Sequence, residues 1–189
     1  MIRIENENLS VGIKPKGAEL SSLINKENGF EHMWQRNADV WKGQAPILFP
    51  IVGELNEGKT LIDGKTFNMQ RHGFLRKMEA ELHEYTDTKA VFRFVANGFT
   101  LPQFPFNFEV LVTFELKAKT LVNSFTVKNL DDKTMPFNIG AHPAFAIPFA
   151  PNEGIEDCYI EFDQAETASR HLLDDKGLFT KELRPVLSN

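Results

Sequence analysis

The chain has 189 residues, of which 42% are hydrophobic, enough apolar side chains for the core of a globular protein. Its 21 basic and 26 acidic residues give a formal net charge of −5, which disfavours nucleic acid and anionic membranes as partners. No stretch approaches the roughly 20 apolar residues of a membrane span, and the first residues are too polar for a signal peptide. A single cysteine, Cys158, makes no intrachain disulfide. These features predict a cytoplasmic protein that does not associate with membranes.

Turn signals come early in the chain. Asn28-Gly29 and Asp63-Gly64 each lie between two short apolar segments. Both dipeptides tolerate the positive φ angles of a two-residue turn, so each predicts a β-hairpin. Between them, the apolar run 44–53 contains prolines at positions 46 and 50. Because proline is disfavoured in central strands, we expect a shaped loop or a sheet edge there.

The later segments alternate between apolar and polar residues. The clearest case is 108–116, where the even positions are all Phe, Val or Leu. We also predict strands at 91–95, at 121–127 and at 158–162, with Cys158 buried in the last of these. Polar turns at 117–120 and 129–133 separate the strands. Helical structure is expected only as short turns near 37–41 and 165–173.

Short strands joined by hairpins predict an all-β fold, an antiparallel sandwich or barrel, because a parallel sheet needs a long crossover after each strand. There is no internal repeat, low-complexity tract or linker in the sequence. We therefore expect a single domain over residues 1–189.

Two segments place histidine or arginine side chains among apolar residues. Residues 70–76 bring Arg71, His72 and Arg76 together around Gly73, and residues 138–145 place His142 between a glycine and a proline. We expect His142 to be partly buried and fixed in one orientation. A lone histidine is more often structural than catalytic, but two imidazoles meeting in a pocket with arginines would protonate a polar substrate and hold its hydroxyls.

Other kinds of site have little support in the sequence. The spacings His-x-His, Cys-x-x-Cys and His-Glu-x-x-His are absent, so we expect no metal. There is no Gly-x-Ser-x-Gly motif and no phosphate-binding glycine loop, which argues against a serine hydrolase and a P-loop nucleotide enzyme.

Three motifs, at residues 45–53, 71–76 and 140–145, resemble in order and spacing those of the aldose 1-epimerase (galactose mutarotase-like) family. The similarity is strongest to its LacX-type and hexose-6-phosphate epimerase-like branch, and it covers essentially the whole chain. It implies a large antiparallel β-sandwich that binds a small-molecule sugar or sugar phosphate on a concave face. It also implies interconversion of the α and β anomers by acid-base ring opening, without a cofactor.

The resemblance assigns roles to single residues. The catalytic acid of the family maps onto His142, and His72 is expected to hydrogen-bond the sugar and help place the charge. Arg71 and Arg76 match arginines that contribute to an anion site in phosphosugar relatives, although surface salt bridges are an equal alternative for them. The side chains that would offer the sugar an aromatic face are Trp34, Trp41, Phe49 and Phe145, although for each of them alone core packing is favoured.

The chain also departs from the family. Family members are longer, and their catalytic base is a glutamate in a late segment that nothing here matches, so the chain resembles the first two thirds of a mutarotase and a sandwich incomplete at its C-terminus. Unpaired sheet edges would favour self-association into a homo-oligomer. Glu54, where relatives often carry a basic or small residue, would repel a phosphate. A non-catalytic carbohydrate-binding module and a plain β-sandwich interaction domain remain as alternatives.

Overall fold

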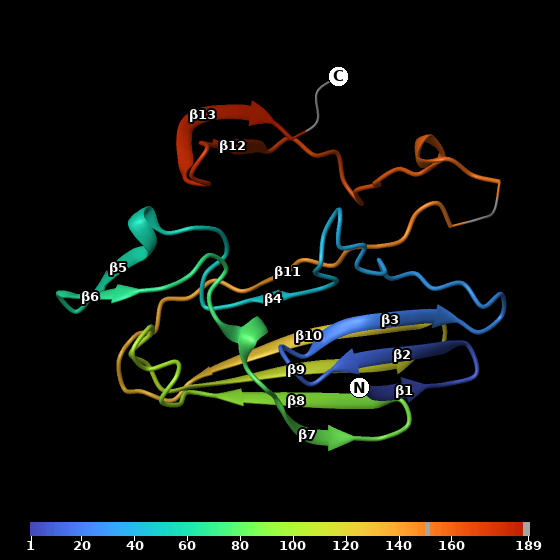
Figure 1. Ribbon diagram of the computed structural model, residues 1–189, viewed down its shortest axis with the longest axis horizontal. Helices are drawn as coiled ribbons and strands as arrows, with labels where there is room; N and C mark the ends of the chain where they lie inside the picture. Colours follow the sequence, from blue (N-terminus) through green and yellow to red (C-terminus); the bar gives the residue numbers. More distant parts are fainter. Residues whose placement is uncertain (150–151, 187–189) are drawn as a thin grey trace.

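The computed structural model describes residues 1–149 and 152–186, and within them the regular structure is almost entirely β (Figure 1). The strands are β1 (Ile2–Glu5), β2 (Leu9–Lys14), β3 (Glu19–Asn25), β4 (Ile47–Leu48), β5 (Lys59–Ile62), β6 (Lys65–Asn68), β7 (Glu81–Tyr85), β8 (Lys89–Val95), β9 (Phe108–Lys117), β10 (Thr120–Asn129), β11 (Gly140–Ala141), β12 (Ser169–Leu173) and β13 (Phe179–Pro185). Three 3-10 turns are η1 (Asn56–Gly58), η2 (Leu75–Lys77) and η3 (Ile155–Asp157). Within the described ranges, none of the helical segments is long and apolar enough to cross a membrane. The predicted all-β class is confirmed.

Two antiparallel sheets form the body of the molecule. One has the order β10-β9-β8-β7 and the other β1-β2-β3, and the second sheet lies against the first with β1 in contact with β8 (Figure 1). Val11 and Ile13 from β2 share one buried cluster with Phe92 from β8 and Phe114 from β9. The predicted antiparallel sandwich is therefore confirmed, with its core between these sheets.

The strongest sequence patterns give the expected elements. The even residues of β9 are 0 to 7% exposed, while the odd ones are partly exposed or exposed. Asp63 and Gly64, with φ of 50° and 75°, connect β5 to β6, and Ala118, with φ of 50°, lies in the two-residue turn between β9 and β10. After β3 the chain also reverses, because Ile24 bridges Glu31 in antiparallel fashion. Local turn chemistry thus sets these three reversals.

A cluster of phenylalanines links the loop at 44–53 to the β10-β9-β8-β7 sheet. The ring of Phe49 lies 5.2 Å from Phe108, 6.2 Å from Phe74 and 6.2 Å from Phe104, in edge-to-face geometry. Phe49 is completely buried. Edge-to-face pairs add about 0.5–1.5 kcal/mol each beyond the burial of their area. This cluster fixes the 44–53 segment, against which the 70–77 loop packs.

Above the sheets lies a layer of short segments. β4 pairs with β11, Phe49 forms a parallel bridge with Gly73, and the β5–β6 hairpin lies beside them (Figure 1). The run 44–53 is thus a shaped segment with one two-residue strand, as its prolines predict. The β12–β13 hairpin lies above this layer (Figure 1).

Two predictions about the last part of the chain are wrong. Residues 158–162 form no strand, Cys158 is only half-buried, and Tyr159 and Ile160 are 83% and 85% exposed. Their side chains favour a strand, but no neighbouring strand among the described residues pairs with them. The helical turn expected near 165–173 is instead the strand β12, paired with β13.

Candidate functional site

Gly73 brings the 70–77 loop against the 44–53 segment. Its φ is +67°, and a Cβ at this position would lie 2.2 Å from the carbonyl oxygen of Phe49. That same carbonyl accepts hydrogen bonds from the N–H groups of Phe74 and Leu75, at 3.0 and 3.3 Å. Only glycine permits so close an approach in this conformation. The contact sets the position of the neighbouring residue, His72.

His72 is joined to Gly53 by two hydrogen bonds. The His72 N–H donates to the Gly53 carbonyl at 2.8 Å, and the Gly53 N–H donates to Nδ1 of the imidazole at 3.0 Å. Because Nδ1 is the acceptor, the proton of the neutral ring resides on Nε2. The fold therefore presents a fixed N–H donor at Nε2 of this half-buried ring.

The surroundings of His72 lower its pKa. Burial is the largest cause, followed by the positive charges of Arg76 and Arg71 and by the imidazole of His142, while the carboxylate of Glu54 acts in the opposite direction. A lowered pKa keeps the ring neutral near pH 7. The same contributions indicate that Glu54 and His142, which come from other segments of the chain, lie near His72 together with its sequence neighbours Arg71 and Arg76.

His142 follows directly after β11, and its N–H donates to the Pro46 carbonyl at 3.2 Å. The side chain is exposed, so the expected partial burial of this histidine is wrong. Its ring packs against Trp41, with ring centroids 5.2 Å apart. Among residues 1–149 and 152–186, no group hydrogen-bonds the His142 ring, so both of its nitrogens are accessible.

Trp41, and not Trp34, is the tryptophan at His142. Trp34 has a structural role, because its backbone N–H donates to the carbonyl of Ala144 and its Nε1–H donates to the carbonyl of Trp41 at 2.9 Å. Gly43 has no side chain to displace the Trp41 ring, which a Cβ there would approach to 2.4 Å. Of the four aromatic residues that the sequence offers as a sugar face, Trp41 is thus the one that contacts His142 within the described part of the chain.

The two arginines differ in their surroundings. Arg76 is partly buried and its Nη2 donates to the carbonyl of Arg71 at 2.9 Å, while its Nε is buried and has no hydrogen-bond partner among the residues that the structure describes. Arg71 is exposed, and a Cβ at Gly177 would lie 3.5 Å from its Nη2. The turn between β12 and β13 thus lies beside Arg71. Arg71 is the arginine with a guanidinium accessible to a ligand.

Phe145 lies on the other side of its segment. Together with Ala141 and Pro143 it lines a groove beside β10, whereas His142 packs on Trp41. Alternate residues of an extended chain point to opposite sides, so Phe145 and His142 face apart. The predicted residues therefore divide into a group around His72 and His142 that includes Trp41, two structural residues, Trp34 and the buried Phe49, and a separate Phe145.

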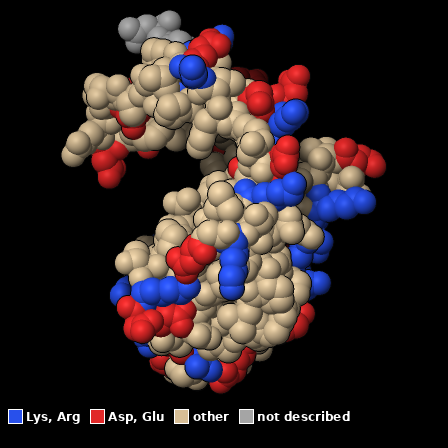
Figure 2. Space-filling model, turned by 90° about the vertical axis from the view of Figure 1, so that its left-hand side faces the viewer, with Lys and Arg blue, Asp and Glu red and all other residues tan. Residues whose placement is uncertain are grey.

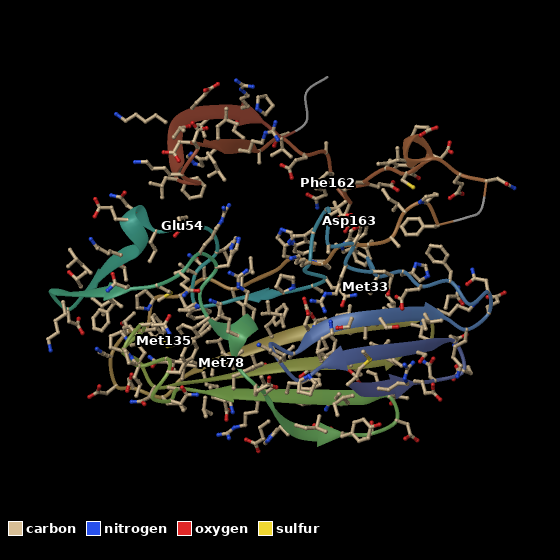
Figure 3. All side chains as sticks on the ribbon, in the orientation of Figure 1. Met33, Glu54, Met78, Met135, Phe162 and Asp163 are labelled. Carbon is tan, nitrogen blue, oxygen red and sulfur yellow. The ribbon has the colours of Figure 1, made fainter. Side chains whose placement is uncertain are left out.

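A hollow lies below the β12–β13 hairpin, whose turn is beside Arg71 (Figure 2). The β12–β13 hairpin overhangs the body of the molecule, and the space-filling view shows a hollow between the two (Figure 2). Glu54 lies on the segment between β4 and β5, below this hairpin, while Phe162 and Asp163 lie on the segment that leads up to β12 (Figure 3). Within the described ranges, no three His, Cys, Asp or Glu side chains are grouped to hold a metal ion.

Residues 1–188 match the family model described as aldose 1-epimerase. Protein LacX (plasmid) from Lactococcus lactis subsp. lactis is 38% identical over 174 residues, which are 89% of this chain and 58% of that protein. Among solved structures, a galactose mutarotase related enzyme from Lactobacillus acidophilus matches with a TM-score of 0.91 and 35% identity, over 97% of this chain and 62% of that one. A galactose mutarotase-like protein from Lactobacillus casei matches with a TM-score of 0.86 and 31% identity, over 98% and 64%.

These relatives support the family resemblance that the three motifs indicate, and they agree with the observed sandwich. The chain spans less than two thirds of the length of each of them. The family model nevertheless matches nearly every residue, and the shared fold includes the segments that carry His72 and His142. The chain belongs to the aldose 1-epimerase family.

Proposed function

We propose that this polypeptide binds an aldose at His72 and His142, in the hollow below the β12–β13 hairpin, and contributes to the interconversion of its α and β anomers. The observation that carries the proposal is the hydrogen bond from the Gly53 N–H to Nδ1 of His72, because it reserves the Nε2–H for a ligand oxygen. The lowered pKa of His72 supports the same neutral, donating form.

The proposed reaction needs one acid and one base. His142, whose ring nitrogens are accessible, donates a proton to the ring oxygen while a base takes the proton of the anomeric hydroxyl. The bond from C1 to the ring oxygen breaks and an aldehyde forms at C1. Rotation about C1–C2 and ring closure, with the proton transfers reversed, then give the other anomer.

His72 would hold the sugar during these steps, donating from Nε2 to one of its oxygens. The ring of Trp41, packed on His142, offers an apolar face for the C–H surface of the sugar. The family resemblance assigns the base to a late glutamate that this chain does not match. Loss of one partner in acid-base catalysis costs typically 10²–10⁴-fold, so we expect the chain alone to bind sugar and to catalyse anomer exchange weakly.

NMR measurements test the proposal. Exchange between the α and β anomers of glucose or galactose reports catalysis, and saturation transfer from protein to sugar reports binding. We expect His72→Ala to reduce the saturation transfer and His142→Ala to reduce the exchange, whereas His83→Ala, at an exposed position on the edge strand β7, changes neither. Absence of both signals in the folded protein would refute the proposal. Sugar contact without faster exchange would support a non-catalytic carbohydrate-binding module instead.

The nature of the sugar depends on the charges around His72. Arg71 offers an accessible guanidinium suited to a phosphate, while the carboxylate of Glu54 would repel one. Affinities for glucose and glucose 6-phosphate, measured before and after Arg71→Gln and Arg76→Ala, separate a hexose phosphate from a neutral hexose. Equal affinities for the two sugars would favour the neutral hexose.

A further inference from the structure

Gln44 is a buried polar residue at the end of the loop that carries Trp41. It is only 3% exposed, whereas the described residues 34–43 include no fully buried side chain. The buried residues next to this loop are Met33 at its start and Gln44 at its end. A segment with so few buried contacts of its own depends on its ends for its position. The position of Trp41 therefore depends on how these two ends are held.

The side-chain amide of Gln44 joins the two ends of the loop. Its Nε2 donates to the carbonyl of Trp34 at 2.8 Å and to the carbonyl of Ser21, on β3, at 3.1 Å. The first hydrogen bond closes the loop, and the second connects this closure to the β1-β2-β3 sheet. Because the Trp34 ring donates to the carbonyl of Trp41, a continuous series of hydrogen bonds runs from β3 to Trp41.

Lys14 sets the orientation of this amide. Its Nζ, at the end of β2, donates to Oε1 of Gln44 at 2.8 Å. An ammonium group only donates and a carbonyl only accepts, so a single orientation of the amide satisfies all three of its partners. Glu19, the first residue of β3, forms an ion pair with Lys14 at 3.6 Å and accepts from the backbone N–H of Gln44 at 3.1 Å. The amide is thus fixed from the side of the sheet.

The backbone of Gln44 holds the segment that carries His142. Its carbonyl accepts from the N–H of Ala144 at 2.7 Å, two residues after His142 in the chain. The carbonyl of Ala144 accepts in turn from the backbone N–H of Trp34 at 3.0 Å. Ala144 is therefore bonded to both residues that the Gln44 amide joins. One buried residue thus connects the loop of the tryptophan with the segment of the histidine.

We propose that Gln44 is a positioning residue whose side-chain amide keeps the ring of Trp41 packed on His142. The inference rests on the proposed function, in which this pair of rings contacts the sugar and supplies the acid. Gln44 acts on the two rings through Trp34 and Ala144. A displacement of about 1 Å at a reacting group can lower a rate about 10²-fold, so such a residue controls the reaction without touching the substrate.

A role in core packing alone does not explain the contacts of Gln44. An apolar side chain of similar length would fill the same space and would need no polar partners, whereas a buried amide is costly unless it is hydrogen-bonded. The amide of Gln44 instead has partners on three segments, β2, β3 and the start of the loop. A fully satisfied buried network of this kind favours one arrangement of the segments that it joins.

Two substitutions of Gln44 test the inference. Gln44→Glu keeps the size of the side chain and the contact with Lys14, but a carboxylate donates to neither carbonyl. Gln44→Met fills the space without any donor or acceptor of this strength and adds no charge. In both variants we expect loss of the nuclear Overhauser contacts between the rings of Trp41 and His142. Anomer exchange should fall by up to about 10²-fold, while protected β9 amides show that the sandwich is folded.

Gln103→Glu is the matched control for these variants. It also removes an Nε2–H that donates to a carbonyl, that of Phe99 at 2.9 Å, on the connection between β8 and β9. The ring contacts and the exchange should both persist in this variant. Their loss in Gln103→Glu as well would overturn the inference, because any lost amide donor would then have the same effect.

The Trp41→Ala background separates positioning from a general loss of structure. If Gln44 acts through Trp41, Gln44→Met reduces saturation transfer to glucose in the original chain and causes no further reduction in Trp41→Ala. Equal reductions in both backgrounds would overturn the inference. Intact ring contacts and unchanged exchange in folded Gln44→Met would also overturn it and would leave the proposed function standing. Loss of the ring contacts in Gln44→Met, in a chain that accelerates no exchange, would support the positioning role and refute the proposed catalysis.

Discussion

Gly53 and His72 are joined by two hydrogen bonds. The Gly53 N–H donates to Nδ1 of the His72 ring at 3.0 Å, and the Gly53 carbonyl accepts from the His72 N–H at 2.8 Å. The first of these bonds exists only while Nδ1 is unprotonated. Protonation of His72 therefore breaks a contact between the two loops that form the candidate site. The charge state of this ring and the local structure are coupled.

This coupling predicts a titration below the ordinary histidine value. The pKa of His72 in the folded protein lies below 6.5, so the unfolded chain takes up its proton first as the pH falls. The contribution of His72 to stability is thus fully present above pH 6.5 and is lost as the pH falls through the folded pKa. Nitrogen-15 NMR of the imidazole measures this pKa, and the same spectra report whether Nε2 carries the proton.

Two charged side chains near His72 shift its pKa in opposite directions, so removing each of them tests the titration. Arg71→Gln removes a positive charge and should raise the pKa of His72, whereas Glu54→Gln removes the opposing carboxylate and should lower it. A pKa of His72 at or above 6.5 in the original chain, or shifts of the same sign in both variants, would contradict this account.

Gly73→Ala should destabilise the protein by more than about 1 kcal/mol, since alanine is incompatible with a strained φ > 0 site. Two costs combine at this position, the φ of +67° and a Cβ 2.2 Å from the Phe49 carbonyl oxygen. Gly64→Ala is the matched control, because its φ is +75° and a Cβ there meets no atom within 4 Å. Urea unfolding of both variants measures the two costs. Equal destabilisation would show that the contact with Phe49 carries no cost.

The sheets could be predicted because the alternation of strand residues and the residues of tight turns are local features of the sequence. The alternation at 108–116 identifies the buried face of β9, and Asp63-Gly64 identifies a turn that needs positive φ at both positions. Residues 158–162 have a similar composition, but a strand forms only where a neighbour pairs with it. No such neighbour lies beside them in the described chain, and composition does not contain that information.

The candidate site could be predicted only in part, because its histidines lie in sequence motifs while some of its contacts depend on the tertiary structure. His72 and His142 carry recognisable motifs, and the fold brings them into one electrostatic neighbourhood. Phe145 shares the motif of His142 but lies on the opposite side, which the alternation of residues 141–145 would have indicated. Trp41 contacts His142 through a loop held by Trp34 and Gly43, a tertiary arrangement without a periodic signal.

Trp41→Ala should release the His142 ring and weaken sugar contact. The two rings lie 5.2 Å apart at 47°, and loss of such a pair typically costs about 0.5–1.5 kcal/mol beyond the lost burial. Nuclear Overhauser contacts between the side chains of residues 41 and 142, together with saturation transfer to glucose, measure both effects. Trp41→Phe keeps an aromatic ring and should retain most of the sugar signal. Full sugar contact in Trp41→Ala would show that this ring does not support the site.

Glu109, in the β10-β9-β8-β7 sheet, should contribute to the stability of the protein at acid pH independently of the candidate functional site. Its carboxylate accepts from Arg93 and Lys128, both at 2.6 Å, and these hydrogen bonds lower its pKa from 4.5 to about 2, with Lys128 the larger cause. Because the folded pKa is depressed, the stabilisation is present above pH 4.5 and is lost as the pH falls from there towards 2. Urea midpoints at pH 5 and pH 3 should therefore differ less in Glu109→Gln than in the original chain. Glu57→Gln, at an exposed pair with Lys59 outside this sheet, is the control and should leave the difference unchanged. An equal loss of stability at pH 3 in the original chain and in Glu109→Gln would mean that the β8–β9–β10 charge network does not set the acid limit.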